Sequence, residues 1–185
     1  TMALLNDGTL RGWGWNASAS LGDGTKTQRN TPVSPVGLGT DNVQVSAGSE
    51  FSCVLLSGGG VKCVGRDYEG ELGDQQGYHV TTYRSSYVNV YGITSAVEIA
   101  TGYYFACARL SDGTLKCWGD NGYSQFGDGT TSQSGSPVSV SGISTATQIA
   151  SGEYHACALL SDATVKCWGS GSSGQIGDGG GVTRT

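Results

Sequence analysis

The chain has 185 residues, enough for one domain with a sizeable core, and a formal net charge of −5. Phosphate binding needs clustered Lys and Arg, which this sequence lacks, so we expect no nucleic-acid partner. No run of about eighteen apolar residues occurs, so no membrane span is predicted. Glycine supplies 32 residues and proline 3, which is typical of tight turns and short strands.

The sequence repeats itself about every fifty residues. Copies that begin at Thr1, Ser52, Ala106 and Ala156 read TMALLNDGTLRGWG, SCVLLSGGGVKCVG, ACARLSDGTLKCWG and ACALLSDATVKCWG. Self-similarity at this period indicates stacked copies of one supersecondary unit. We therefore treat the chain as a single repeat array, with repeats at approximately 1–51, 52–105, 106–155 and a partial one at 156–185.

Each repeat after the first carries two cysteines ten residues apart, namely Cys53 and Cys63, Cys107 and Cys117, and Cys157 and Cys167. Six cysteines allow fifteen pairings, but the repetition favours one disulfide inside each repeat. The first repeat has Met2 and Gly12 at the two equivalent positions, so it lacks both cysteines together. Joint loss is what a bonded pair would predict. Free core thiols are the alternative. Disulfides would indicate an oxidising compartment, and hence an extracellular or cell-surface protein.

The two cysteines of a pair lie in two short, partly apolar runs that flank a three-residue connection. This pattern predicts a β-hairpin with the two cysteines opposite each other. The third loop residue is Gly8, Gly59 or Gly113, which suits a left-handed backbone. Ala163 holds that position in the last repeat, so we expect local strain there.

A Gly-Asp turn, a Thr-Pro-Val or Ser-Pro-Val segment and a glycine-ended apolar strand recur after the hairpins. About four short strands per repeat, with no helical periodicity, predict an all-β propeller of four-stranded blades. The string from Gln148 to Gly169, followed by Gly174-Gln-Ile-Gly-Asp-Gly179, resembles the regulator of chromosome condensation repeat. The paired cysteines resemble its bacterial extracellular branch. That resemblance implies seven blades, whereas about three and a half repeats are present, so we expect a longer parent chain or self-association.

The second repeat contains four extra residues before Tyr87. This insertion brings together Tyr78, His79, Tyr83 and Arg84, and Tyr and Arg on loops favour recognition. The alternative is a variable loop without a partner. Trp15 is a weaker binding candidate, because local packing would explain it as well. Its neighbour Asn16 begins a glycosylation sequon, whose use the sequence leaves open.

Other recurring residues have structural explanations. We expect the tryptophan column (Trp13, Trp118 and Trp168, with Val64 as its exception) to pack in the core. The recurrent aspartates of the Gly-Asp turns should cap backbone amides rather than bind calcium, so no metal or cofactor is expected. His155 occupies a column that holds Phe51 and Phe105, and no catalytic constellation is evident, so the sequence predicts no enzyme.

These observations predict an extracellular or cell-surface structural or interaction module, such as a scaffold, adhesin or fibre component. The alternative is a specific binder, either a lectin-like module or a protein inhibitor, and the partner (protein or glycan) is not identified. A guanine-nucleotide exchange or chromatin factor is a third possibility, which the negative charge and the disulfides both oppose.

Overall fold

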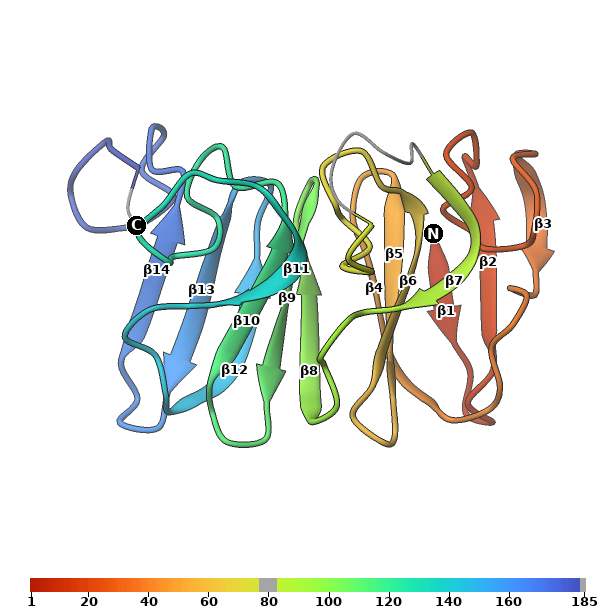
Figure 1. The fold of residues 1–185 in the computed structure, drawn as a ribbon, viewed down its shortest axis with the longest axis horizontal. Coiled ribbons are helices and arrows are strands. Elements are labelled where there is room, and N and C mark those ends of the chain that lie inside the picture. Colours follow the sequence, from red (N-terminus) through yellow and green to blue (C-terminus); the bar gives the residue numbers. More distant parts are fainter. Residues whose placement is uncertain (77–82, 184–185) are drawn as a thin grey trace.

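The computed structural model describes residues 1–76 and 83–183. Within these ranges the chain forms fourteen strands and no helix. The strands make four antiparallel sheets that follow one another in sequence order from one side of the molecule to the other (Figure 1). Two sheets have four strands and two have three.

The first sheet contains β1 (Met2–Leu4), β2 (Leu10–Gly14) and β3 (Arg29–Val33). The second contains β4 (Asn42–Ala47), β5 (Phe51–Leu56), β6 (Val61–Arg66) and β7 (Tyr83–Asn89). The third contains β8 (Ala96–Thr101), β9 (Phe105–Leu110), β10 (Leu115–Gly119) and β11 (Ser134–Ser139). The last contains β12 (Ala146–Ser151), β13 (His155–Leu160) and β14 (Val165–Gly169).

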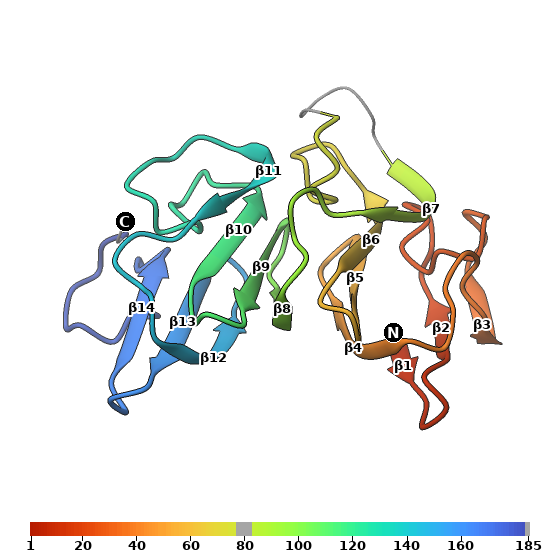
Figure 2. The same ribbon diagram turned by 60° about the horizontal axis from the view of Figure 1, so that its bottom comes forward.

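Each sheet is a meander in which every strand pairs with the next strand of the chain. Neighbouring sheets meet through β4, β8 and β12, which are the first strands of their sheets (Figure 2). This radial repetition of four-stranded meanders is a propeller architecture, as the sequence predicts. The first sheet begins at the equivalent of β5, and the last ends at the equivalent of β6.

The cysteine hairpins form as predicted. Cys53 faces Cys63, Cys107 faces Cys117 and Cys157 faces Cys167, and each pair is disulfide-bonded. Met2 faces Gly12 in the hairpin that lacks cysteines. Closing so short a loop restricts the unfolded chain and stabilises each hairpin by about 2–3 kcal/mol. Ala163 has a φ of 66°, so the expected left-handed strain is present.

The core lies between successive sheets. One cluster joins the second and third sheets and includes Phe51 and Trp118; another joins the third and fourth and includes Phe105 and Trp168. Both tryptophans also bond across the junction, since Trp118 Nε1 donates to the Glu71 carbonyl at 2.9 Å. Trp168 Nε1 donates in the same way to the Gln125 carbonyl at 2.7 Å. Trp118 and Trp168 therefore fasten the third and fourth sheets to the sheets that precede them.

The junction between the first and second sheets uses a different pair. Val64 stands in the tryptophan column, and Tyr87 of β7 packs beside it against Gly22. A Cβ placed on Gly22 would lie 2.6 Å from Tyr87 Cε2. The Tyr87 hydroxyl is buried and has no hydrogen-bond partner among the described residues, and burial raises the pKa of this phenol. In the sequence Tyr87 stands at the end of the insertion. In the structure its ring is packed between sheets, in space that the smaller Val64 leaves where other repeats have tryptophan.

Candidate functional site

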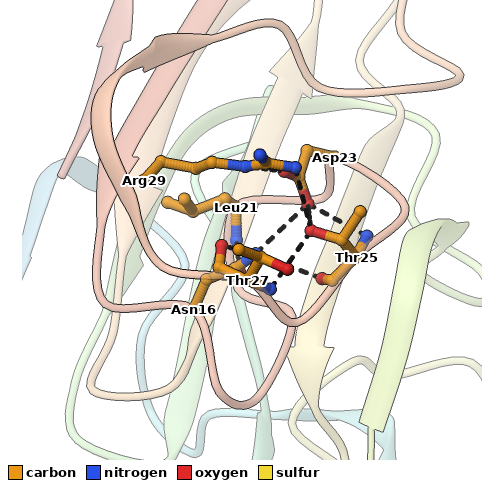
Figure 3. A network of polar contacts seen from close by, with 6 residues as sticks. All are labelled: Asn16, Leu21, Asp23, Thr25, Thr27 and Arg29. Carbon is orange, nitrogen blue, oxygen red and sulfur yellow. Dashed lines mark hydrogen bonds and ion pairs between the residues drawn. The ribbon is translucent and has the colours of Figure 1, made fainter.

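The loop after β2 folds around the side chain of Asn16, which is fully buried (Figure 3). Its Oδ1 accepts from the Leu21 amide at 2.9 Å. Its Nδ2 donates to Asp23 Oδ1 at 3.1 Å and to the carbonyls of Thr25 and Thr27 at 3.1 and 3.2 Å. The amide nitrogen that a glycan would need is therefore committed to the fold, which excludes glycosylation of Asn16 in the folded chain.

The Gly-Asp turn beside Asn16 shows why aspartate recurs there. Asp23 Oδ1 accepts from the backbone amide and the hydroxyl of Thr25, at 3.0 and 2.8 Å. Arg29 Nε donates to Asp23 Oδ2 at 2.6 Å. Burial opposes ionisation, but the hydrogen bonds from Thr25 and Arg29 outweigh it and lower the pKa of Asp23.

The equivalent Gly-Asp turn of the second repeat, at Asp74, positions Arg84, which is one of the binding residues predicted from the sequence. Arg84 lies opposite Gly65, as Arg29 lies opposite Gly14, and its Nη2 donates to Asp74 Oδ2 at 3.1 Å. The Arg84–Asp74 ion pair is therefore the counterpart, in the second sheet, of the Arg29–Asp23 ion pair of the first. A role for Arg84 in binding stays a prediction.

The remaining predicted binding residues lie on separate elements or outside the described ranges. Trp15 is 50% exposed in the loop after β2. Tyr83 begins β7, is 39% exposed, and has Lys26 Nζ 3.8 Å from its ring centroid. Tyr78 and His79 fall outside the described residues.

The loops after β6 and β10 form the next part of the surface. Each carries a hydrogen-bonded pair of side chains, and the first member of the pair is Arg66 at the end of β6 but Asp120 after β10. After β10, Gln125 Nε2 donates to Asp120 Oδ2 at 2.9 Å. After β6, Glu71 occupies the place of Gln125, and Arg66 donates from Nη1 to Glu71 Oε1. Glu71 is fully buried, and burial raises the pKa of its carboxyl to about 7 even though Arg66 opposes the shift.

The guanidinium of Arg66 also stacks on aromatic rings. It lies 3.8 Å from the centroid of Tyr104 and 5.4 Å from that of Tyr68. The aromatic contacts continue from Tyr104 to Tyr103 at 4.3 Å, from Tyr103 to Tyr154 at 5.5 Å and from Tyr154 to Tyr123 at 4.9 Å, centroid to centroid. We call this series the tyrosine strip, which consists of Arg66, Tyr68, Tyr103, Tyr104, Tyr123 and Tyr154.

The strip crosses three sheets at one end of their strands, opposite the cysteine-hairpin turns. β14 ends and β13 begins at the upper edge of Figure 1, so the loop between β12 and β13 that carries Tyr154 belongs to this edge. Backbone bonds between neighbouring blades hold its centre, since Ser49 N donates to the Tyr103 carbonyl at 3.1 Å. Tyr103 N in turn donates to the Glu153 carbonyl at 2.9 Å. The inner loops of three blades are thus bonded to one another, and the rings sit on a fixed support.

The surroundings of the strip are acidic. Burial, the neighbouring Tyr103 and the charge of Glu50 raise the pKa of Tyr104 to about 12. Burial and the adjacent Glu153 likewise raise the pKa of Tyr154. The ends of the strip are accessible, because Tyr68 is 40% exposed and Tyr123 is 48% exposed. The strip can therefore offer ring faces, phenol hydroxyls and carboxylates to a partner.

Sequence reasoning missed the strip. One available signal was that Tyr104 and Tyr154 directly precede the packing column of Phe105 and His155, where the second repeat has Glu50. His155 itself packs against Gly152, as Phe105 packs against Gly102. In the part of the chain that the structure describes, no group of three or more His, Cys, Asp or Glu side chains is placed to hold a metal ion. The same residues include no helix able to cross a membrane.

Comparison with known proteins finds relatives with the same repeat. The chain is 34% identical over 137 residues to the human E3 ubiquitin-protein ligase HERC2, which covers 71% of this chain and 3% of HERC2. It is 30% identical over 132 residues to the Arabidopsis thaliana ultraviolet-B receptor UVR8, covering 70% of this chain and 29% of the receptor. The chain thus spans less than a third of either relative.

Among solved structures, Prp20p of Saccharomyces cerevisiae superposes with a TM-score of 0.81 at 27% identity, over 99% of this chain and 46% of Prp20p. Human WBSCR16 superposes with a TM-score of 0.83 at 22% identity, over 100% of this chain and 47% of WBSCR16, and supports the fold alone. Two family models described as the regulator of chromosome condensation (RCC1) repeat match the sequence, one at residues 7–55 and 112–159, the other at 43–71, 96–125 and 146–175. The chain belongs to the regulator of chromosome condensation repeat family.

Proposed function

We propose that the chain is a non-enzymatic interaction module that works outside the cell or on its surface and binds partners through the tyrosine strip. The strip carries the proposal, because Arg66 and the tyrosine rings form one connected series across three blades, with accessible ends. Tyrosine and arginine provide large, rigid contact areas and hydrogen-bonding groups, and they are enriched at binding hot spots.

The disulfides support the extracellular part of the proposal. All six cysteines are paired, one bond in each of three hairpins, and free cysteines are absent from the described residues. Disulfides of this kind persist in oxidising compartments. Native protein should therefore contain no titratable thiol before reduction. Reduced Cys107 and Cys117 in freshly isolated material would argue for a reducing compartment and against the extracellular assignment.

Binding through the strip can be tested with matched tyrosine variants. The double variant Tyr103→Ala, Tyr154→Ala removes the centre of the strip, and Tyr91→Ala removes a tyrosine that is 57% exposed outside it. We expect the first variant to lose signals on a glycan array and partners retained from the extracellular fraction, while the second keeps them. Equal retention by both variants would place the binding surface elsewhere.

We also propose that a further blade covers the free face of the last sheet, supplied by a longer parent chain or by self-association. Val165 is 63% exposed, whereas its equivalents Val61 and Leu115 are 2% and 0% exposed beneath a following sheet. An apolar column of this kind favours burial against another sheet.

The polar contacts at the occupied junctions indicate how a further blade would be seated. Gln44 Nε2 donates to the Ile99 carbonyl, and Ile99 N donates to Gln44 Oε1, both at 2.9 Å. Glu98 Oε2 accepts from Ile149 N at 3.2 Å at the next junction. Gln148 is the next side chain of this series and is exposed on the last sheet. Sedimentation of the chain should show association that Val165→Lys weakens; an unchanged compact monomer for both would contradict self-association.

A further inference from the structure

We infer that the tyrosine strip binds a basic protein segment, with a Lys or Arg side chain of the partner seated on Tyr154 and Tyr123 beside Glu153. This inference rests on the proposed function, because it names the partner of the same surface. Three observations carry it: an internal example of the same recognition, an acidic site at the other end of the strip that forms no ion pair with a described Lys or Arg, and the local charge.

The internal example is Arg66. Its guanidinium is stacked on Tyr104, with its carbon 3.8 Å from the ring centroid. Its nitrogen atoms are paired with carboxylates, since Nε lies 3.8 Å from Glu50 Oε2 and Nη2 lies 3.5 Å from Glu69 Oε1. One end of the strip therefore already holds a guanidinium between a tyrosine face and carboxylates, which is the arrangement that we infer for the partner at the other end.

The other end has the rings and the carboxylates, and none of the described Lys or Arg residues forms an ion pair there. Tyr154 and Tyr123 contact each other at 4.9 Å, and the exposed Glu153 directly precedes Tyr154. Asp120 lies next to the strip, because its backbone N donates to the Tyr104 carbonyl at 2.9 Å. Across residues 1–76 and 83–183, no Lys or Arg forms an ion pair with Glu153 or Asp120.

The charge of the strip favours a cation over a neutral or acidic partner. Arg66 is its one cationic member, and it is surrounded by three carboxylates: Glu50, Glu69 and Glu71. Glu153 and Asp120 add negative charge at the far end, and the whole chain has a net charge of −5. An acidic segment would be repelled here, whereas Lys and Arg gain both ring contact and ion pairing.

The test uses the full chain and two synthetic peptides of alternating glycine with either arginine or glutamine. Binding is followed by fluorescence anisotropy at about 50 mM and about 300 mM salt, conditions that differ in electrostatic screening. We expect the arginine peptide to bind at least about tenfold more tightly than the glutamine peptide, because a stacked and paired guanidinium contributes on this scale. The higher salt concentration should weaken this binding.

Matched variants separate a specific site from general attraction to an acidic protein. Glu153→Gln removes one carboxylate beside the strip, and Asp41→Asn removes one exposed carboxylate at the hairpin-turn end of the strands. We expect Glu153→Gln and Tyr154→Ala to weaken binding of the arginine peptide severalfold and Asp41→Asn to leave it nearly unchanged. Equal effects of Glu153→Gln and Asp41→Asn would overturn the inference, as would the absence of binding or equal affinity for the two peptides.

The inference and the proposed function can fail separately. If Tyr103→Ala, Tyr154→Ala abolishes glycan or partner binding while Glu153→Gln and salt have no effect, the strip remains the binding surface and the basic segment is excluded. If the arginine peptide binds equally well to the double tyrosine variant, the inference falls, whereas the proposed use of the strip is decided by the glycan and partner binding of that variant.

Discussion

The sheet β4–β7 and the sheet β8–β11 share one plan but satisfy it with different residues. In the third sheet Asp120 accepts from the Gln125 amide, whereas in the second Arg66 donates to Glu71. Donor and acceptor have exchanged sides, and the bond between the two positions is kept. The comparison shows that the two positions can be joined with the donor on either side.

A second difference between the two sheets is not compensated. Asn121 accepts from the Phe126 amide and donates from Nδ2 to the carbonyls of Thr130 and Ser132. Asp67 occupies the same place in the second sheet, where its Oδ1 accepts from the Leu72 amide at 3.2 Å. Among the described residues its Oδ2 is buried without a hydrogen-bond partner, and burial together with Asp74 raises the pKa of Asp67 to about 6. An acceptor thus stands where the third sheet has a donor.

The largest effect is expected from breaking the Arg66–Glu71 pair. Arg66→Met leaves a fully buried carboxylate unpaired and should lower the free energy of unfolding by about 3–5 kcal/mol at pH 8. The loss should be smaller at pH 5, because the raised pKa of Glu71 lets it become neutral there. Chemical denaturation at both pH values measures this.

A double substitution sharpens the same comparison. Arg66→Asp with Glu71→Gln copies the pair of the third sheet and should recover most of the stability lost by either single change. Equal stability of the single and double variants would show that the two positions are not coupled.

The next largest change in stability is expected at Asp67. Asp67→Asn restores the donor of Asn121 and should raise the free energy of unfolding at pH 7 by about 1–3 kcal/mol. The reverse change, Asn121→Asp, should lower it by a similar amount. Thermal unfolding of both variants checks this, and a destabilised Asp67→Asn protein would contradict the role assigned to the unpartnered oxygen.

The same position predicts a pH dependence. Because the folded-state pKa of Asp67 is raised from its ordinary 3.8 to about 6, the folded chain holds this proton more tightly than the unfolded chain. The contribution of Asp67 to stability is therefore full at low pH and is lost as the pH rises from about 4 through 6. Asp67→Asn should remove this component of the pH profile, and an identical profile in both proteins would exclude it.

The junctions differ in a way that predicts a moderate effect. Val64→Trp places an indole where Tyr87 already packs against Gly22 and should cost about 1–3 kcal/mol through overpacking. Adding Tyr87→Pro, which copies the residue of β11 at Pro137, should recover part of that loss. Denaturant midpoints of the two variants decide this; no recovery in the double variant would show that the tyrosine and the tryptophan do not share one space.

The smallest effect concerns the Tyr87 hydroxyl. Tyr87→Phe removes a buried oxygen that has no hydrogen-bond partner in the described part of the chain, and it should leave stability unchanged or raise it by about 1 kcal/mol. Tyr91→Phe, at an exposed tyrosine, is the control and should have no effect. Clear destabilisation by Tyr87→Phe alone would mean that the hydroxyl has a stabilising partner.

The features that could be predicted from the sequence are those set by short separations along the chain. The hairpins, the disulfide register and the left-handed Ala163 depend on residues within about a dozen positions, where loop length fixes which residues face each other. The tryptophan column could be predicted because repetition shows the same residue in the same strand. Repetition also identified the propeller, since each unit must bury its face against a similar one.

Only the tertiary structure decided which loops form a surface. Tyr68, Tyr103 and Tyr154 belong to different blades. They become members of one strip because the radial arrangement gathers loops that are far apart in sequence. The inward position of Tyr87 likewise depends on the space beside Val64, which belongs to a neighbouring strand and faces a different sheet. Contacts between blades are set by how the sheets pack rather than by the local pattern, and that physical reason separates the strip from the hairpins.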